Sequence, residues 1–131
     1  MNNLHQIVGH LADSYLPLAV RRHSFFVNDV PQDLSVDHNR EWIASVISGL
    51  LSAVTGQANH TCIRLKAKKY DHIVVLTIQE SNNTNGYALA GELKKVFSLA
   101  EKNGGCLSIS VPVIDNTTIS FSFPNLPSLA N

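Results

Sequence analysis

The sequence predicts an α/β two-layer sandwich, in which three helices lie on one face of a mixed, mostly antiparallel sheet. Residues 39–58 carry apolar side chains at the spacing of one helical face, and that face is too apolar for a helix on the surface. Residues 61–79 and 106–123 each read as two strands that alternate apolar and polar residues around a turn. Because one face of each hairpin is polar, we expect helices on only one side of the sheet.

Length and composition indicate one domain over residues 1–131, with residues 125–131 as a flexible tail. Hydrophobic residues make up 44% of the chain and charged residues 15%, and ten basic residues balance ten acidic ones. This balance does not favour a nucleic-acid partner. No apolar run is long enough for a membrane span and no signal-peptide pattern is present, so a cytoplasmic location is expected.

The first 36 residues predict a helix followed by two short strands. An amphipathic helix is expected over residues 3–22, where Pro17 could kink it. A strand over residues 24–28 and a turn at residues 30–33 follow. Residues 34–36 are expected to form a second short strand that returns to the first.

The central helix over residues 39–58 is expected to begin at Asn39, whose side-chain oxygen can cap it. Gly56 is expected to end it in a left-handed conformation. Leu50 is predicted to lie in the core between this helix and the sheet. The apolar face as a whole consists of Ile43, Val46, Ile47, Leu50, Leu51 and Val54.

Two antiparallel hairpins and one further helix complete the chain. Residues 61–79 form the first hairpin and residues 106–123 the second. Between them we expect a loop over residues 81–86 and a helix over residues 88–103, which Gly104 and Gly105 end.

The order and spacing of four segments resemble a known family. PLAVRRHSFFVNDVPQDLSV is similar to its entry segment of helix, strand, turn and strand, and WIASVISGLLSAV to the helix that carries its asparagine box. AGELKKVFSLAEKNGGCLSISV resembles its last helix, double glycine and following strand, and NTTISFSFP its closing strand. The family is the ATP-binding catalytic domain of bacterial sensor histidine kinases, in the GHKL superfamily that also contains gyrase and MutL. The resemblance implies a histidine-kinase-like ATPase fold from Leu4 to Pro124.

The resemblance also locates the family's nucleotide site, which is degenerate in this chain. The family's central helix reads N-L-L-x-N-A, and its asparagines meet the phosphates and the magnesium ion, which prefers oxygen ligands. The matching residues here, Gly49 and Ala53, have no side-chain oxygen. The adenine-binding aspartate of the family is matched by Glu80, and the glycines that follow it by Asn82 and Thr84.

The family's second glycine box, which cradles phosphates at the start of the last helix, is also altered. Ala90, Gly91, Glu92 and Leu93 stand at its positions, and the side chains of Ala90 and Glu92 would crowd the cradle. The Glu92 carboxylate would also repel phosphate. About nine residues separate Glu80 from Ala90, so the family's long ATP lid is missing.

Three functional interpretations follow. The first is a degenerate ATPase domain without independent kinase activity or a cofactor. It would act in bacterial two-component signalling as a protein-interaction or phosphotransfer-associated module, with a response regulator or a dimerising histidine-phosphotransfer hairpin as partner. The second is an active kinase domain that binds ATP and magnesium, and the third is a small scaffold outside signalling. Glu80 is the one position of the family's site at which a contact to adenine is still possible. The alternative interpretation is that Glu80 is a half-buried carboxylate at the end of a strand.

Other candidate functional residues have structural interpretations. Trp42 covers the sheet edge or marks a partner-binding surface, and His5 and His10 are solvent-facing helix residues rather than phospho-acceptors. Cys62 and Cys106 are interpreted as reduced thiols in strands. They form no CxxC pair and have no histidine at metal-ligand spacing, so the sequence predicts no metal site.

Overall fold

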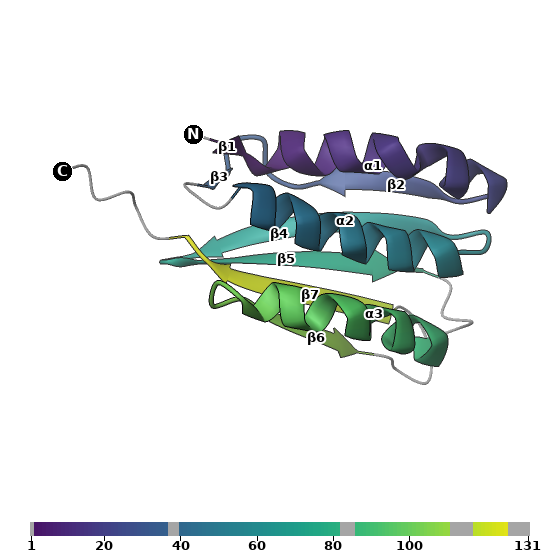
Figure 1. The fold of residues 1–131 in the computed structure, drawn as a ribbon. Helices are drawn as coiled ribbons and strands as arrows, with labels where there is room; N and C mark the ends of the chain where they lie inside the picture. Colours follow the sequence, from purple (N-terminus) through teal and green to yellow (C-terminus); the bar gives the residue numbers. More distant parts are fainter. Residues whose placement is uncertain (1, 37–39, 82–85, 111–116, 126–131) are drawn as a thin grey trace.

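The computed structural model describes residues 2–36, 40–81, 86–110 and 117–125, and it confirms the predicted two-layer sandwich. Three helices cover one face of a five-stranded sheet whose strand order is β2-β4-β5-β7-β6 (Figure 1). Among the described strands of this sheet, only β2 and β4 pair in parallel. The helices are α1 (Leu4–Arg21), α2 (Arg40–Gln57) and α3 (Gly86–Glu101), and the strands are β2 (Phe25–Asp29), β4 (Cys62–Tyr70), β5 (Ile73–Glu80), β6 (Cys106–Ser110) and β7 (Thr117–Pro124).

A second, two-stranded sheet corrects the predicted pairing of residues 34–36. The strand β3 (Ser35–Val36) pairs with β1 (Asn2–Asn3), not with β2. The Leu4 N–H donates to the Leu34 carbonyl at 3.0 Å and joins this small sheet to the start of α1. The turn at residues 30–33 led to the prediction that residues 34–36 return to β2. In the structure β2 pairs in parallel with β4, and the residues of the turn do not indicate this pairing.

The alternation of the two hairpins separates a buried face from a solvated one. Leu65 pairs with Ile78 on the inner face, and both side chains are buried. Arg64 and Lys66 point the other way and are exposed. The inner face packs against α2, where Leu50 has no exposed surface, as predicted. Burial of this continuous apolar layer is the main stabilising contribution to the fold.

The ends of the helices differ from several predictions. Helix α2 continues through Gly56 to Gln57, so Gly56 does not end it, and the left-handed conformation falls on His60 with a φ of 52°. Helix α1 continues through Pro17. Gly104 follows α3 with a φ of 82°, in agreement with its predicted stop. The predicted cap Asn39 lies outside the described residues.

The end of the last strand is more ordered than the predicted tail. Asn125 is buried, its N–H donates to the His72 carbonyl at 2.7 Å, and its side chain donates to the Ser35 carbonyl at 3.1 Å. The prediction of a tail beginning at residue 125 is therefore wrong for this residue, and residues 126–131 lie outside the described part. None of the described helices is long and apolar enough to cross a membrane.

Candidate functional site

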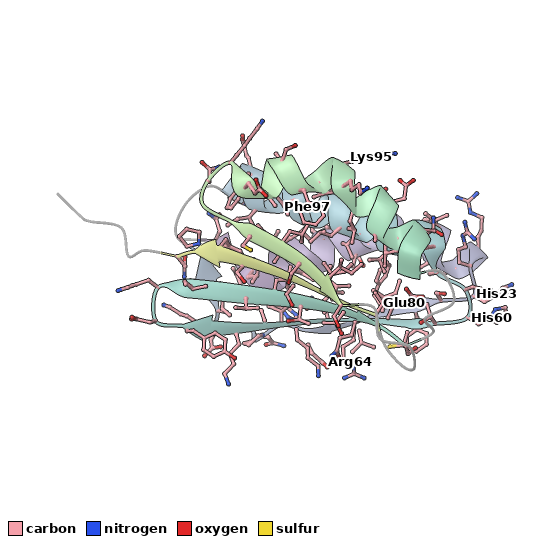
Figure 2. The ribbon with its side chains drawn as sticks, turned by 90° about the horizontal axis from the view of Figure 1, so that it is seen from below. His23, His60, Arg64, Glu80, Lys95 and Phe97 are labelled. Carbon is pink, nitrogen blue, oxygen red and sulfur yellow. The ribbon has the colours of Figure 1, made fainter. Side chains whose placement is uncertain are left out.

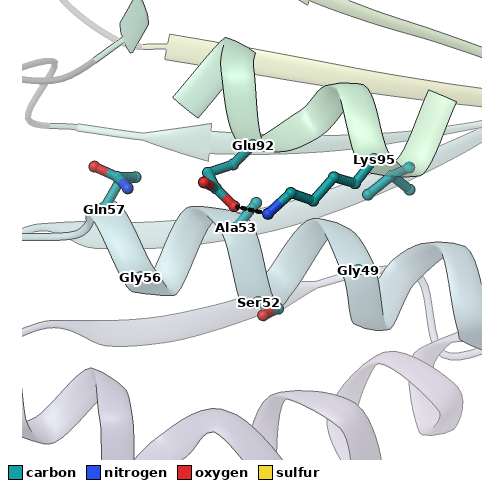
Figure 3. A pocket seen from close by; sticks show the side chains of 8 residues that line it. Gly49, Ser52, Ala53, Gly56, Gln57, Glu92 and Lys95 are labelled. Atoms are coloured by element: carbon teal, nitrogen blue, oxygen red, sulfur yellow. Dashed lines mark hydrogen bonds and ion pairs between the residues drawn. The ribbon is translucent and has the colours of Figure 1, made fainter. Parts of the chain in front are cut away.

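A groove between α2 and α3 contains three of the five positions that the sequence singled out. Gly49 and Ala53 come from α2 and Glu92 from α3, and the groove has a volume of about 280 Å³ (Figure 3). Its complete lining is Gly49, Ser52, Ala53, Gly56, Gln57, Glu92, Lys95 and Val96. Glu80 and Ala90 do not line it. Helical periodicity places Val96 four residues after Glu92, which is the sequence signal that could have identified this lining residue.

Helix α3 packs closely against α2 at Gly49. A Cβ atom built on Gly49 would lie 3.0 Å from Cγ2 of Val96, a separation at which one of the two groups must move. Close-packed interiors tolerate such an addition poorly. Glycine at this position therefore permits the close approach of α2 and α3, and any larger residue there would require Val96 to shift by a few tenths of an ångström.

The remaining groove surface is polar but carries no net charge. The Lys95 ammonium lies 3.2 Å from the Glu92 carboxylate, and Figure 3 shows this ion pair on the α3 side of the groove. Both side chains are exposed, so water screens their interaction. The lysine is already paired with an anion of its own chain, and the carboxylate disfavours a second anion at the same place.

Helix α3 begins four residues before Ala90, which changes the interpretation of the phosphate cradle. Only the first four N–H groups of a helix lack carbonyl partners within the helix. Because α3 starts at Gly86, Ala90 and Glu92 lie beyond these four groups. Their N–H groups are therefore directed to carbonyls one turn back. The positions that match the family's second glycine box do not present free donors here.

Glu80 lies at the end of β5 and on the inner face of the sheet (Figure 2). It pairs with Ile63 on one side and Thr117 on the other, and only 5% of its surface is exposed. Burial raises the pKa of the Glu80 carboxyl from its ordinary value of 4.5 to about 7. No side chain in the described ranges forms an ion pair with it. At neutral pH this group is present in both protonation states, and its acid form can donate as well as accept a hydrogen bond.

The segment between Glu80 and α3 is short. Strand β5 ends at Glu80 and α3 begins at Gly86, so residues 81–85 connect them. This connection is shorter than the sequence interval from Glu80 to Ala90, because α3 begins at Gly86 and not at the predicted residue 88. Asn82 and Thr84, which match glycines of the family, lie outside the described residues.

The other candidate residues occupy structural positions. The indole N–H of Trp42 donates to the Leu99 carbonyl at 2.6 Å, and its ring meets Phe121 edge-on with centroids 5.5 Å apart. This supports the interpretation that Trp42 covers the sheet. His5 contacts the Val30 carbonyl through Nδ1 at 2.8 Å, whereas His10 is exposed.

The cysteines and the remaining titratable groups form no cluster of three ligands. Cys62 and Cys106 are free thiols, the first half-buried and the second exposed, and the strand register places both on the outer face of the sheet. Across the described ranges, no three His, Cys, Asp or Glu side chains meet in an arrangement that could hold a metal ion.

The comparison with known proteins identifies the fold. No protein-family model and no curated protein matches the chain. Among solved structures, the nucleotide-free catalytic domain of the histidine kinase ThkA matches with a TM-score of 0.74 at 13% identity, covering 94% of this chain and 92% of that one. The histidine kinase AdeS of Acinetobacter baumannii matches with a TM-score of 0.79 at 10% identity, covering 96% of this chain and 66% of that one.

A third structure is a longer histidine kinase with a partner. ThkA in complex with the response regulator protein TrrA matches with a TM-score of 0.76 at 16% identity, over 97% of this chain and 42% of that one. At these identities the similarity establishes a shared fold. The sequence-based prediction of a histidine-kinase-like fold is therefore confirmed.

Proposed function

We propose that this chain, which has the fold of histidine kinase catalytic domains, is a degenerate member of that group that acts through protein contacts in bacterial two-component signalling without binding Mg-ATP. The observation that carries the proposal is the contact between α3 and α2 at Gly49. A Cβ atom at the position of the family's asparagine would lie 3.0 Å from Val96 Cγ2, so α3 crowds the place from which that side chain would extend.

The groove lacks side-chain oxygens at the two positions that match the family's asparagines, although the Ser52 hydroxyl, the Gln57 amide and the Glu92 carboxylate line it. Gly49 and Ala53 offer no oxygen, and the ammonium of Lys95 is paired with Glu92. Removing one charge-assisted hydrogen bond to a phosphate costs about 1.5–3 kcal/mol of binding free energy. Since about 1.4 kcal/mol is a tenfold change in affinity, removing two or three such bonds would take a micromolar site beyond millimolar.

The partner class is supported by the fold and by one of its structural neighbours. ThkA, whose structure was solved with a response regulator, contains a domain of this fold. A response regulator is therefore the partner that we propose first for this chain, with a dimerising histidine-phosphotransfer hairpin as the second. Either partner would bind the chain without nucleotide.

The experiment has two arms. Isothermal titration with Mg-ATP and with ADP is expected to show no binding tighter than about millimolar, and radiolabelled ATP is expected to leave the chain unlabelled. Purified receiver domains from the same genome are then tested for binding by pull-down. Micromolar Mg-ATP binding would overturn the nucleotide-free proposal, and failure to bind any receiver domain or phosphotransfer hairpin would overturn the partner assignment.

Glu80 favours a second candidate function, weak recognition of an adenine ring. An inward-facing carboxyl whose pKa burial raises to about 7 can, in its acid form, both donate to and accept from one edge of a base. Adenosine without phosphates tests this candidate because it does not require the groove. Binding detected by NMR that is lost in Glu80→Leu, which has neither a donor nor an acceptor, would favour it, and an unchanged spectrum at millimolar adenosine would contradict it.

A further inference from the structure

Two histidines that are distant in the sequence stack at one end of the sandwich. His23 lies between α1 and β2, and His60 lies between α2 and β4. Their ring centroids are 4.7 Å apart and the ring planes differ by 19°. Figure 2 shows the pair together at the end of the molecule. Both side chains are exposed, so neither ring contributes to the core.

The backbone holds the two histidines in place. The His60 N–H donates to the Arg22 carbonyl at 3.0 Å, and the Thr61 N–H donates to the buried Ser24 hydroxyl at 3.1 Å. These bonds join the two loops directly beside the rings. His23 and His60 both have left-handed backbone conformations, with φ values of 55° and 52°. The separation between the two Cα atoms is therefore fixed, while each exposed ring can rotate.

A hydrogen bond holds one of the two rings at its Nδ1 atom. Nδ1 of His60 lies 2.8 Å from Oδ1 of Asn59, and an amide oxygen can only accept. When Nδ1 donates this hydrogen bond, Nε2 of the neutral ring carries the lone pair that a metal ion would bind. A carbonyl-type acceptor on the far nitrogen is the arrangement that orients histidines which bind metals through the other nitrogen.

We propose that His23 and His60 form a surface site for a borderline divalent transition metal ion, represented by Zn²⁺ or Cu²⁺, with water completing the coordination. Imidazole nitrogen suits these ions, whereas Mg²⁺ and Ca²⁺ prefer oxygen ligands. Rotation of the exposed rings would bring one nitrogen from each to the metal at the usual distance of about 2.0–2.1 Å. The ion would then cross-link the loops that lead into the parallel strands β2 and β4.

The test is a titration of the untagged chain with ZnCl₂, with His23→Asn and His60→Asn as variants. Asparagine tolerates the left-handed backbone better than most residues, so these changes remove the imidazole with little strain. His72→Asn is the matched control, because His72 is also exposed in a turn but lies in the β4–β5 hairpin. We expect one zinc ion to bind the wild type, each ligand variant to lose roughly tenfold or more in affinity, and the control to be unchanged.

A second measurement keeps the proposal testable if a variant does not fold. In NMR spectra of the wild-type imidazole protons, the signals of His23 and His60 should move first and together as zinc is added. Asn59→Ala should weaken binding by about tenfold, as expected for the loss of a group that orients a ligand. Absence of wild-type binding at millimolar zinc, equal loss in His72→Asn, or first movement of other histidine signals would overturn the site.

Discussion

The two halves of the candidate nucleotide site differ in how their residues are packed. In the groove between α2 and α3, Gly49 allows a tight helix contact and no charge is buried. At the end of β5, by contrast, Glu80 buries a carboxyl whose pKa is raised to about 7 by that burial. The first half has become part of the helix packing. The second retains a polar group at a cost in stability, because a buried carboxylate with no ion-pair partner among the described residues is unfavourable.

The two regions therefore contrast close helix packing with a buried polar group. Gly49 has no side-chain ligand, and its lack of a Cβ atom permits the close contact with Val96. Glu80 provides a buried carboxyl group at the end of β5. Substitutions at four positions test this contrast, from the largest expected effect to the smallest.

The core beside Gly49 sets the scale for packing effects. Leu50 follows Gly49 in α2, has no exposed surface and belongs to the main apolar cluster. Leu50→Ala should lower the free energy of unfolding by about 2–5 kcal/mol, because it removes buried atoms and leaves a cavity. Urea denaturation would measure this, and a loss below about 1 kcal/mol would show that this face of α2 is not the main packing face.

Glu80 should make stability depend on pH in a defined direction. Its pKa is about 7 when folded against an ordinary value of 4.5, so the folded state holds the proton more tightly between these values. The free energy of unfolding should therefore fall as pH rises from about 4.5 to 7, by about 3 kcal/mol in total. The stabilising contribution of Glu80 is fully present below about pH 4.5 and is lost above about pH 7.

Glu80→Gln is the variant that isolates this effect from those of the other residues. It removes the ionisable group while keeping its size, so the difference in unfolding free energy between wild type and variant should grow with pH. Urea titrations at pH 5, 6, 7 and 8 would measure the difference. A difference that stays constant across this range would contradict the raised pKa.

Gly49→Asn tests whether the groove can accept the family's asparagine. The added side chain meets Val96, so the variant should lose about 1–3 kcal/mol, as expected for overpacking. Gly56→Asn is the matched control on the same helix, because an added Cβ there meets nothing within 4 Å. That control should change stability by only about 0.5 kcal/mol or less.

A double variant distinguishes the contact from a general effect of asparagine. Val96→Ala in the Gly49→Asn background should recover part of the lost stability if the two side chains collide. Thermal denaturation of the four chains in this cycle gives the coupling energy directly. If the two substitutions have additive effects on stability, the side chain introduced at position 49 does not collide with Val96.

The smallest effect is expected for the ion pair at the groove. Glu92→Gln removes the interaction with Lys95, but both side chains are exposed and three residues apart on one helix. Such pairs contribute about 0.5 kcal/mol or less. A larger loss in denaturant titration would show that the pair helps to hold α3 against α2.

The sequence was sufficient where one local rule decides the structure. Alternation in residues 61–79 placed Leu65 and Ile78 on the buried face, and the same parity placed Glu80 there. Helical periodicity identified the face of α2 that contains Leu50. These signals are local, because a strand changes face at every residue and a helix returns to the same face about every 3.6 residues.

Only the tertiary structure decided which distant segments meet. It paired β3 with β1, seated Val96 against Gly49, continued α2 beyond Gly56, and stacked His23 on His60. None of these arrangements has a period or spacing in the chain. Residue type and periodicity determine which face of an element is buried, whereas the partner of that face depends on how whole elements pack and on where the backbone finds its remaining hydrogen bonds.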